Sequence, residues 1–141
     1  MILIDSSVWI DYFRGAATAE TDRLDQLLGA ELVLVGDIIL AEVLQGFASE
    51  RDFRQARQLF DAIDVVQIVD RNIALRSAQN FRTLRRQGIT VRKTIDTLIA
   101  TRCIESGLAL LYSDRDFDPF VAHLGLVSAM DEPPSDAPGR G

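Results

Sequence analysis

Five acidic residues stand beside or inside apolar segments of this chain of 141 residues. Asp5 ends the apolar run "ILI", and Asp114 and Asp116 follow "LALLY" within "SDRDFD". Glu42 lies within "IILAEVL" and Asp96 within "TIDTLIA". A carboxylate among apolar neighbours loses its hydration at a high cost in free energy unless a cation or a hydrogen-bond donor pairs with it. These five residues are therefore the first candidates for chemistry.

Taken singly, most of these acids also have a purely structural interpretation. Asp5 can cap a helix that begins at Ser6 or Ser7, although either serine could cap that helix instead. Asp96 can favour the dipole of a helix that Thr94 caps. The two acids after "LALLY" can be solvated turn residues. Only the glutamate within "IILAEVL" lacks such an explanation, because apolar residues surround it at helical spacing.

Taken together, the acids indicate a metal site. Carboxylates that gather in one place repel one another, and a bound cation keeps them ionised. The chain has one histidine and one cysteine, so the available ligands are oxygen atoms, which suit Mg²⁺ or Mn²⁺. A hard divalent cation activates water and neutralises charge on a phosphate. Phosphodiester hydrolysis is the reaction that these parts fit.

The elements that must position the acids alternate between strands and helices. Apolar runs predict strands at 2–4, 32–35, 65–69, 108–112 and 126–129. Helical periodicity predicts helices at 6–13, 20–29, 37–47, 50–62, 70–87, 94–106 and 117–123. Strands that are apolar throughout are buried on both faces, so we expect an α/β fold with three α/β/α layers and a central parallel sheet of about five strands.

The predicted topology brings the acids together. In such a sheet the functional crevice lies beyond the carboxyl ends of the strands. The acids at 5, 114 and 116 follow strands, and those at 42 and 96 lie near helix starts on the same edge. We expect one domain over 1–130 and a disordered tail over 131–141, which is rich in proline and poor in apolar residues.

Charge and hydropathy limit the class of protein. The formal net charge is −6, which by itself argues against a nucleic-acid partner. Basic residues nevertheless gather just before the acid at 96, and four of them could contact the phosphates that flank a cleaved phosphodiester bond: Arg85, Arg86, Arg92 and Lys93. No apolar run approaches the ~20 residues that cross a bilayer, so no membrane association is expected. The lone Cys103 and the lack of a signal-peptide pattern favour a cytoplasmic protein.

The motifs "ILIDSSVWIDYF", "AEVLQG", "TIDTLIA" and "LLYSDRDFD" resemble, in order and spacing, those of the PIN-domain family, specifically VapC-type toxins of type II toxin–antitoxin systems. The resemblance spans about 1–130. It implies an endoribonuclease dependent on Mg²⁺ or Mn²⁺, a homodimer, and a cognate VapB-type antitoxin that occludes the site. The acidic quartet of the family matches Asp5, Glu42, Asp96 and Asp114.

The resemblance also suggests a role for each residue. Asp5, Asp96 and Asp114 are expected to bind metal directly or through water, and Asp116 is an additional or alternative ligand. Glu42 is expected to be a ligand or the base that orients the attacking water. Ser6 or Ser7 matches a supporting hydroxyl. Many relatives carry threonine at the position of Tyr112, which leaves the hydrogen bonding near Asp114 open.

Other doubly wound α/β proteins are the alternatives. A phosphoacceptor domain needs an aspartate after its third strand, where Asp70 is available, and a lysine after its last strand, for which Lys93 is too early. A haloacid-dehalogenase-like phosphatase needs a second aspartate where Ser7 stands. A non-catalytic domain that acts through protein–protein binding remains the third alternative, and RNA cleavage that EDTA abolishes would exclude it.

Overall fold

The computed structural model describes residues 1–131, so the tail predicted over 131–141 lies outside the described residues except for Asp131. Four parallel strands form the sheet in the order β3-β2-β1-β4. Their bounds are β1 (Ile2–Ile4), β2 (Val33–Gly36), β3 (Val65–Val66) and β4 (Ala109–Leu111). The fifth strand expected at 126–129 is reduced to one parallel bridge between Leu110 and Ser128.

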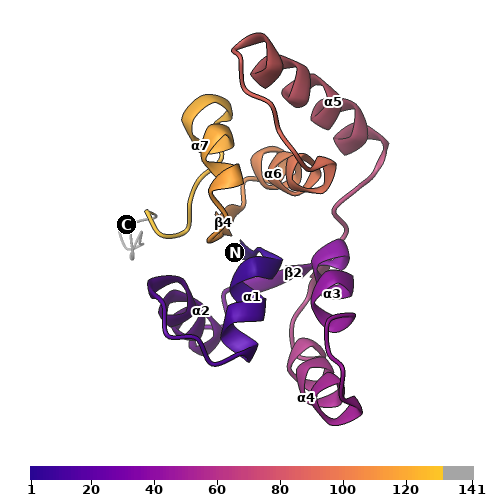
Figure 1. Cartoon of the computed structure of the whole chain (residues 1–141), viewed down its shortest axis with the longest axis vertical. Coiled ribbons are helices and arrows are strands. Elements are labelled where there is room, and N and C mark those ends of the chain that lie inside the picture. The colour runs from indigo at the N-terminus through magenta and orange to yellow at the C-terminus, as the bar shows by residue number, and fades with distance from the viewer. Residues whose placement is uncertain (132–141) are drawn as a thin grey trace.

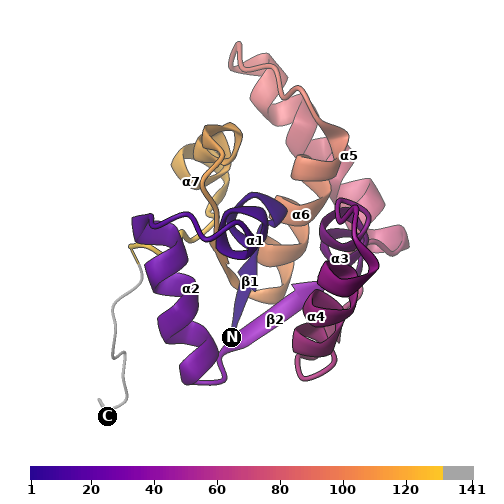
Figure 2. The same cartoon turned by 60° about the horizontal axis from the view of Figure 1, so that its bottom comes forward.

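Helices cover both faces of the sheet (Figures 1 and 2), which confirms the predicted three-layer α/β/α architecture. The helices are α1 (Ser6–Phe13), α2 (Ala19–Gly29), α3 (Asp37–Leu44), α4 (Glu50–Phe60), α5 (Arg71–Arg86), α6 (Thr94–Ser106) and α7 (Asp118–Leu124), with a short 3₁₀ helix, η1 (Arg115–Phe117), before α7. Between residues 1 and 131, no helix is long and apolar enough to span a membrane.

The central strand β1 sets the position of the first acid. All three of its residues are buried, and Ile4 pairs in register with Leu111 of β4. The amide of Asp5 then donates to the carbonyl of Leu111 at 2.9 Å. The chain therefore leaves β1 and β4 side by side, so that Asp5 lies next to the loop that carries Asp114 and Asp116.

Aromatic packing fixes α1 over the sheet. Trp9 is fully buried, and its ring contacts that of Phe60 in α4 with 4.8 Å between centroids and that of Phe13 at 5.9 Å. Aromatic side chains bury large areas and prefer such edge-on or offset contacts. Because α1 begins directly after Asp5, this cluster also holds the end of β1 in place.

A close approach requires glycine at the end of β2. A Cβ atom on Gly36 would lie 2.7 Å from the Cδ1 atom of Ile68, which is fully buried. The next residue, Asp37, accepts hydrogen bonds through Oδ1 from the amides of Ile38 at 2.8 Å and Ile68 at 3.0 Å. This contact joins the start of α3 to the segment after β3 and so positions the helix that carries Glu42.

Candidate metal centre

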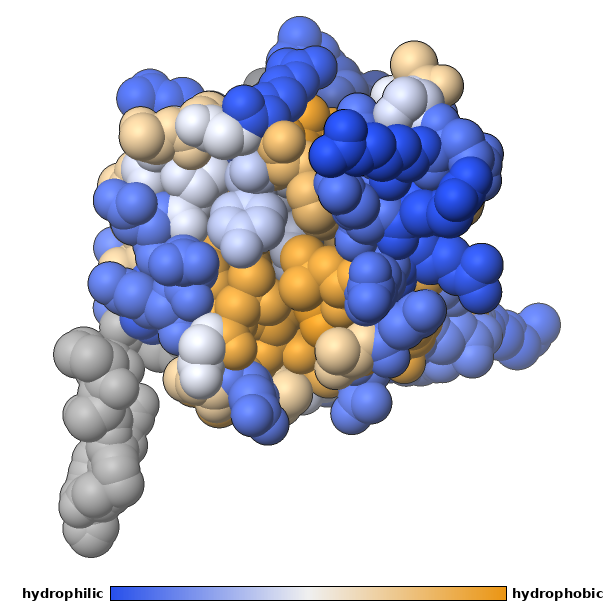
Figure 3. Space-filling view, turned by 90° about the horizontal axis from the view of Figure 1, so that it is seen from below, coloured by the Kyte–Doolittle hydropathy of each residue, from blue (hydrophilic) through white to orange (hydrophobic). Residues whose placement is uncertain are grey.

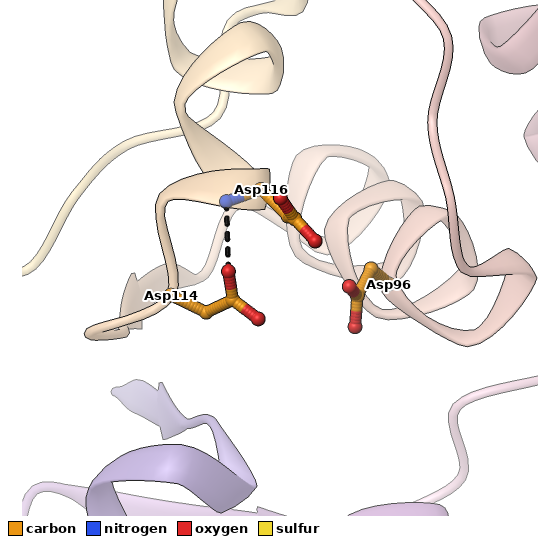
Figure 4. A group of neighbouring side chains, drawn as sticks. All are labelled: Asp96, Asp114 and Asp116. Carbon is orange, nitrogen blue, oxygen red and sulfur yellow. Dashed lines mark hydrogen bonds between the residues drawn. The ribbon is translucent and has the colours of Figure 1, made fainter.

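Three of the predicted ligands converge at the carboxyl edge of the sheet (Figure 4). One carboxylate oxygen from each of Asp96, Asp114 and Asp116 lies within 4.8 Å of the other two. Asp96 comes from the first turn of α6, and the other two from the loop after β4. The amide of Asp116 donates to Oδ1 of Asp114 at 2.9 Å, which holds that loop in shape. We refer to these three residues as the acidic cluster.

Asp96 is the member of the acidic cluster whose surroundings most favour a cation as a partner. Its side chain is buried, with the residue only 6% exposed, and its Oδ2 atom has no hydrogen-bond partner. Burial, reinforced by the negative charge of Asp5, raises the pKa of Asp96 to about 6, although nearby Lys93 acts in the opposite direction. Three carboxylates that approach one another, one of which has a buried oxygen without a donor, form a ligand set that fits a hard divalent cation.

Asp5 is both a helix cap and a neighbour of the cluster. Its Oδ2 atom accepts from the amide of Ser7 at 3.2 Å and from the Ser7 hydroxyl at 2.6 Å, which makes Asp5 the N-cap of α1. Of the two capping alternatives that the sequence left open, the structure has Asp5 and not a serine, because the helix begins at Ser6, one residue earlier than a Ser6 cap would require. Burial raises the pKa of Asp5, the Ser7 hydrogen bonds oppose it, and the charge of Asp114 adds to it.

Glu42 lies in α3 outside the acidic cluster, and the charged groups that act on it are Asp5 and Lys93. Its Oε1 atom is buried and has no hydrogen-bond partner. Burial raises the pKa of Glu42, a hydrogen bond from the Ser6 side chain lowers it, and the charge of Asp5 raises it. Glu42 therefore interacts with Asp5, and Asp5 with Asp114, in one chain of charged neighbours.

The four predicted basic residues divide into two pairs. Arg92 donates through Nη2 to both carboxylate oxygens of Asp116 at 3.1 Å, and Nζ of Lys93 lies 3.9 Å from Oδ2 of Asp114. Arg85 and Arg86 lie exposed in the last turn of α5, where the Arg85 guanidinium lies over the ring of Phe81. Sequence reasoning found Arg92 and Lys93 but missed that they pair with the acids themselves.

Helix α6 has the expected bounds, but its cap differs from expectation. Thr94 is the first residue of the helix and not its cap, and Lys93 occupies the cap position without a side-chain hydrogen bond to the helix. The backbone of Lys93 is extended, and helical backbone angles begin at Thr94, so Lys93 is the residue at the cap position. The first turn therefore carries Asp96 with its negative charge near the positive end of the helix dipole.

Two further residues serve other contacts. Asp70 caps α5 by accepting from the amide of Ile73 at 2.9 Å, and it pairs with Arg102 at 3.0 Å, both of which lower its pKa. It therefore has a structural role, which speaks against the phosphoacceptor alternative.

The Tyr112 hydroxyl donates to Asp118 at 3.0 Å, so its bond is directed away from Asp114.

Comparison with known proteins identifies relatives over almost the whole chain. The family described as "PIN domain" matches residues 2–120. "VapC ribonuclease Mb1587" of Mycobacterium bovis and "Ribonuclease VapC11" of Mycobacterium tuberculosis are each 31% identical over 131 residues, which cover 92% of this chain and 98% of the relative.

Solved structures share the fold at lower sequence identity. VapBC2 from Rickettsia felis, bound to a promoter DNA fragment, matches with a TM-score of 0.70 and 16% identity, covering 91% of this chain and 97% of the other. FitAcB from Neisseria gonorrhoeae matches with a TM-score of 0.69 and 19% identity, covering 91% and 96%. These likenesses support the α/β/α fold.

Proposed function

This chain belongs to the PIN-domain family, and on that premise we propose that it is a metal-dependent endoribonuclease of the VapC toxin type. The observation that carries the proposal is the acidic cluster with the buried, unpartnered Oδ2 atom of Asp96. Relatives that are 31% identical over nearly their full length bear the name ribonuclease. RNA is therefore the substrate class that we propose.

The acidic cluster would hold the cation. Asp96, Asp114 and Asp116 offer one oxygen each, and Asp5 adds a buried carboxylate beside Asp114. A bound Mg²⁺ or Mn²⁺ supplies a Lewis acid for a phosphate oxygen and lowers the pKa of a bound water. The protein contributes the fixed positions of these oxygens, which the short loop after β4 and the first turn of α6 maintain.

Glu42 is the proposed proton acceptor. Because burial raises its pKa and its Oε1 atom has no partner, the side chain is available to orient a water and take its proton. The two Ser7 hydrogen bonds hold the carboxylate of Asp5 in place, and the Ser6 side chain lowers the pKa of Glu42 and so favours its ionised form. Ser6 and Ser7 thus act as positioning residues.

We further propose a VapB-type protein inhibitor and a homodimer as the assembly partners. Solved toxin–antitoxin complexes share this fold, and the face shown in Figure 3 carries a continuous hydrophobic patch between charged flanks. Near the start of the sheet, Leu28 of α2, Leu59 of α4 and Ile63 line a hollow together with Met1. Exposed apolar surface of this kind is typical of protein contacts. We propose the cytoplasm as the compartment of action.

The test is to express the chain without an inhibitor and to sequence the RNA ends that appear. Wild-type protein should generate new ends at specific positions, and the Asp5→Asn variant should not. RNA ends that are the same for the two proteins would contradict the proposed activity. Co-expression of a cognate VapB-type antitoxin should suppress the new ends.

A further inference from the structure

Two cations of the chain itself occupy positions beside the acidic cluster. Arg92 contacts both oxygens of Asp116, and Lys93 approaches Oδ2 of Asp114. Both basic residues come from the segment that connects α5 to α6. Two of the three negative charges of the cluster are thereby balanced within the chain, and only Asp96 retains a buried oxygen without a partner.

The basic side chains in these two contacts are exposed to solvent, and the acidic side chains are less so. The Arg92 side chain is 76% exposed and that of Lys93 is 60% exposed, whereas the carboxylates they meet are 23% and 33% exposed. Ion pairs with such exposed members contribute little to stability, because water and salt screen them and their long side chains lose rotamer freedom. Arg92 and Lys93 can therefore leave the cluster at small cost.

A divalent cation and these side chains need the same oxygens. Metal coordination would place a charge of +2 among Asp96, Asp114 and Asp116, which removes the attraction that holds Arg92 and Lys93 in place. Their side chains would then project from the rim of the site, where an RNA backbone brings negative charge. Arginine suits this exchange because a guanidinium can hydrogen-bond either a carboxylate or a phosphate.

We propose that Arg92 and Lys93 are internal counter-cations of the acidic cluster, which a divalent metal displaces from Asp116 and Asp114 and so frees for the phosphates of RNA. This inference rests on the proposed function, since it assumes the metal site and the RNA substrate. It adds a coupling between the two ligands: metal strengthens RNA binding partly through Arg92, and RNA strengthens metal binding by the same factor.

The first test measures Mn²⁺ affinity of the full chain by isothermal titration calorimetry. Arg92→Gln removes the competing cation and should tighten Mn²⁺ binding about two- to five-fold, the range of an exposed ion pair. The matched control is Arg82→Gln, which loses the same charge. Arg82 is exposed on α5 and lines a hollow with Thr94 and Thr97 of α6, yet within residues 1–131 it forms no ion pair.

The second test measures RNA affinity by fluorescence anisotropy in a Glu42→Gln background, which suppresses cleavage. Mn²⁺ should strengthen RNA binding, and the gain should be smaller by about two-fold or more when Arg92 is also changed to glutamine. Equal gains with and without Arg92 would overturn the coupling.

The calorimetric outcomes separate this inference from the proposed function. Weaker Mn²⁺ binding in Arg92→Gln would show that Arg92 orients Asp116 for the metal, and a change equal to that of Arg82→Gln would show a general charge effect. Either result overturns the counter-cation role while the metal-dependent ribonuclease stands. A wild-type chain that binds no Mn²⁺ would overturn the inference and the proposed metal site together.

Discussion

Ser7 donates two hydrogen bonds to the same oxygen of Asp5, from its amide at 3.2 Å and from its hydroxyl at 2.6 Å, both to Oδ2. Neither bond uses Oδ1. Through this oxygen the Asp5 carboxylate caps α1. The helix start and the candidate metal centre thus share Asp5. Substitutions that keep or remove its ability to cap the helix can separate its role in stability from its role in the metal centre.

Replacing Ser7 by alanine should weaken both roles. The variant loses the short hydroxyl bond to a buried carboxylate, which we expect to lower the free energy of unfolding by about 1–2 kcal/mol. RNA cleavage should also fall, because Asp5 is then free to turn. Denaturant unfolding and initial cleavage rates measure the two effects. Ser7→Thr keeps a hydroxyl on the same carbon and should retain more of both; a threonine variant as impaired as alanine would contradict this role.

Two substitutions of Asp5 should separate capping from chemistry. Asparagine caps helices about as well as aspartate, so Asp5→Asn should keep the fold and lose RNA cleavage. Asp5→Ala should lose cleavage and also about 1 kcal/mol of stability through the missing cap. Thermal unfolding in EDTA, compared with cleavage in Mg²⁺, provides the readout. Wild-type cleavage by Asp5→Asn would remove this residue from the site.

Stability of the metal-free protein should depend on pH through Asp96. Its pKa in the folded protein is raised to about 6 from the ordinary value of 3.8, so between these values the folded state holds a proton that the unfolded state has released. The contribution of Asp96 to the free energy of unfolding is therefore fully present below about pH 4, and it is lost as the pH rises through 6.

Urea unfolding in EDTA at several pH values tests this dependence. As the pH rises from 4 to 7, the wild type should lose stability relative to Asp96→Asn, because Asp96 ionises and asparagine does not. A difference that stays constant over this range would mean that Asp96 titrates near its ordinary pKa. Saturating Mn²⁺ should remove the effect, since a bound cation favours the ionised form.

Arg102 should matter for stability and not for chemistry. It donates to the carbonyl of Ile68 at 3.1 Å, to Asp70 at 3.0 Å and to the Ser106 hydroxyl at 3.2 Å, and its side chain is only 17% exposed. Arg102→Ala should lower the free energy of unfolding by about 1–3 kcal/mol. RNA cleavage per folded molecule should stay at the wild-type level. A selective loss of cleavage in a fully folded variant would contradict the structural role.

The sequence predicted the fold well where patterns are long and uninterrupted. The helices at 6–13 and 94–106 begin and end as expected, because apolar periodicity and following glycines are local signals. The strand expected at 126–129 is reduced to a bridge at Ser128, since pairing at a sheet edge depends on geometry that the run "LVSA" does not encode. The sequence left the cap of α1 open between Asp5 and a serine because aspartate and serine cap helices about equally well.

The candidate site was predictable in its members and not in its contacts. Parallel topology alone places residues after β1 and β4 at one edge, which is why Asp5 and Asp114 could be foreseen as neighbours. The pairing of Arg92 with Asp116 joins residues 24 positions apart through an irregular connection, and no periodic pattern reports such a contact. The unpartnered Oδ2 atom of Asp96 likewise emerges only from packing.

We infer that the acidic cluster binds a divalent cation that RNA cleavage requires. The most direct measurement is cleavage of a purified RNA by the purified full chain after EDTA treatment, with Mn²⁺ then titrated back, for wild type and Asp96→Asn. We predict no cleavage in EDTA, recovery that saturates with Mn²⁺ in the wild type, and no recovery in Asp96→Asn. Cleavage that persists in EDTA, or full recovery by Asp96→Asn, would contradict the claim.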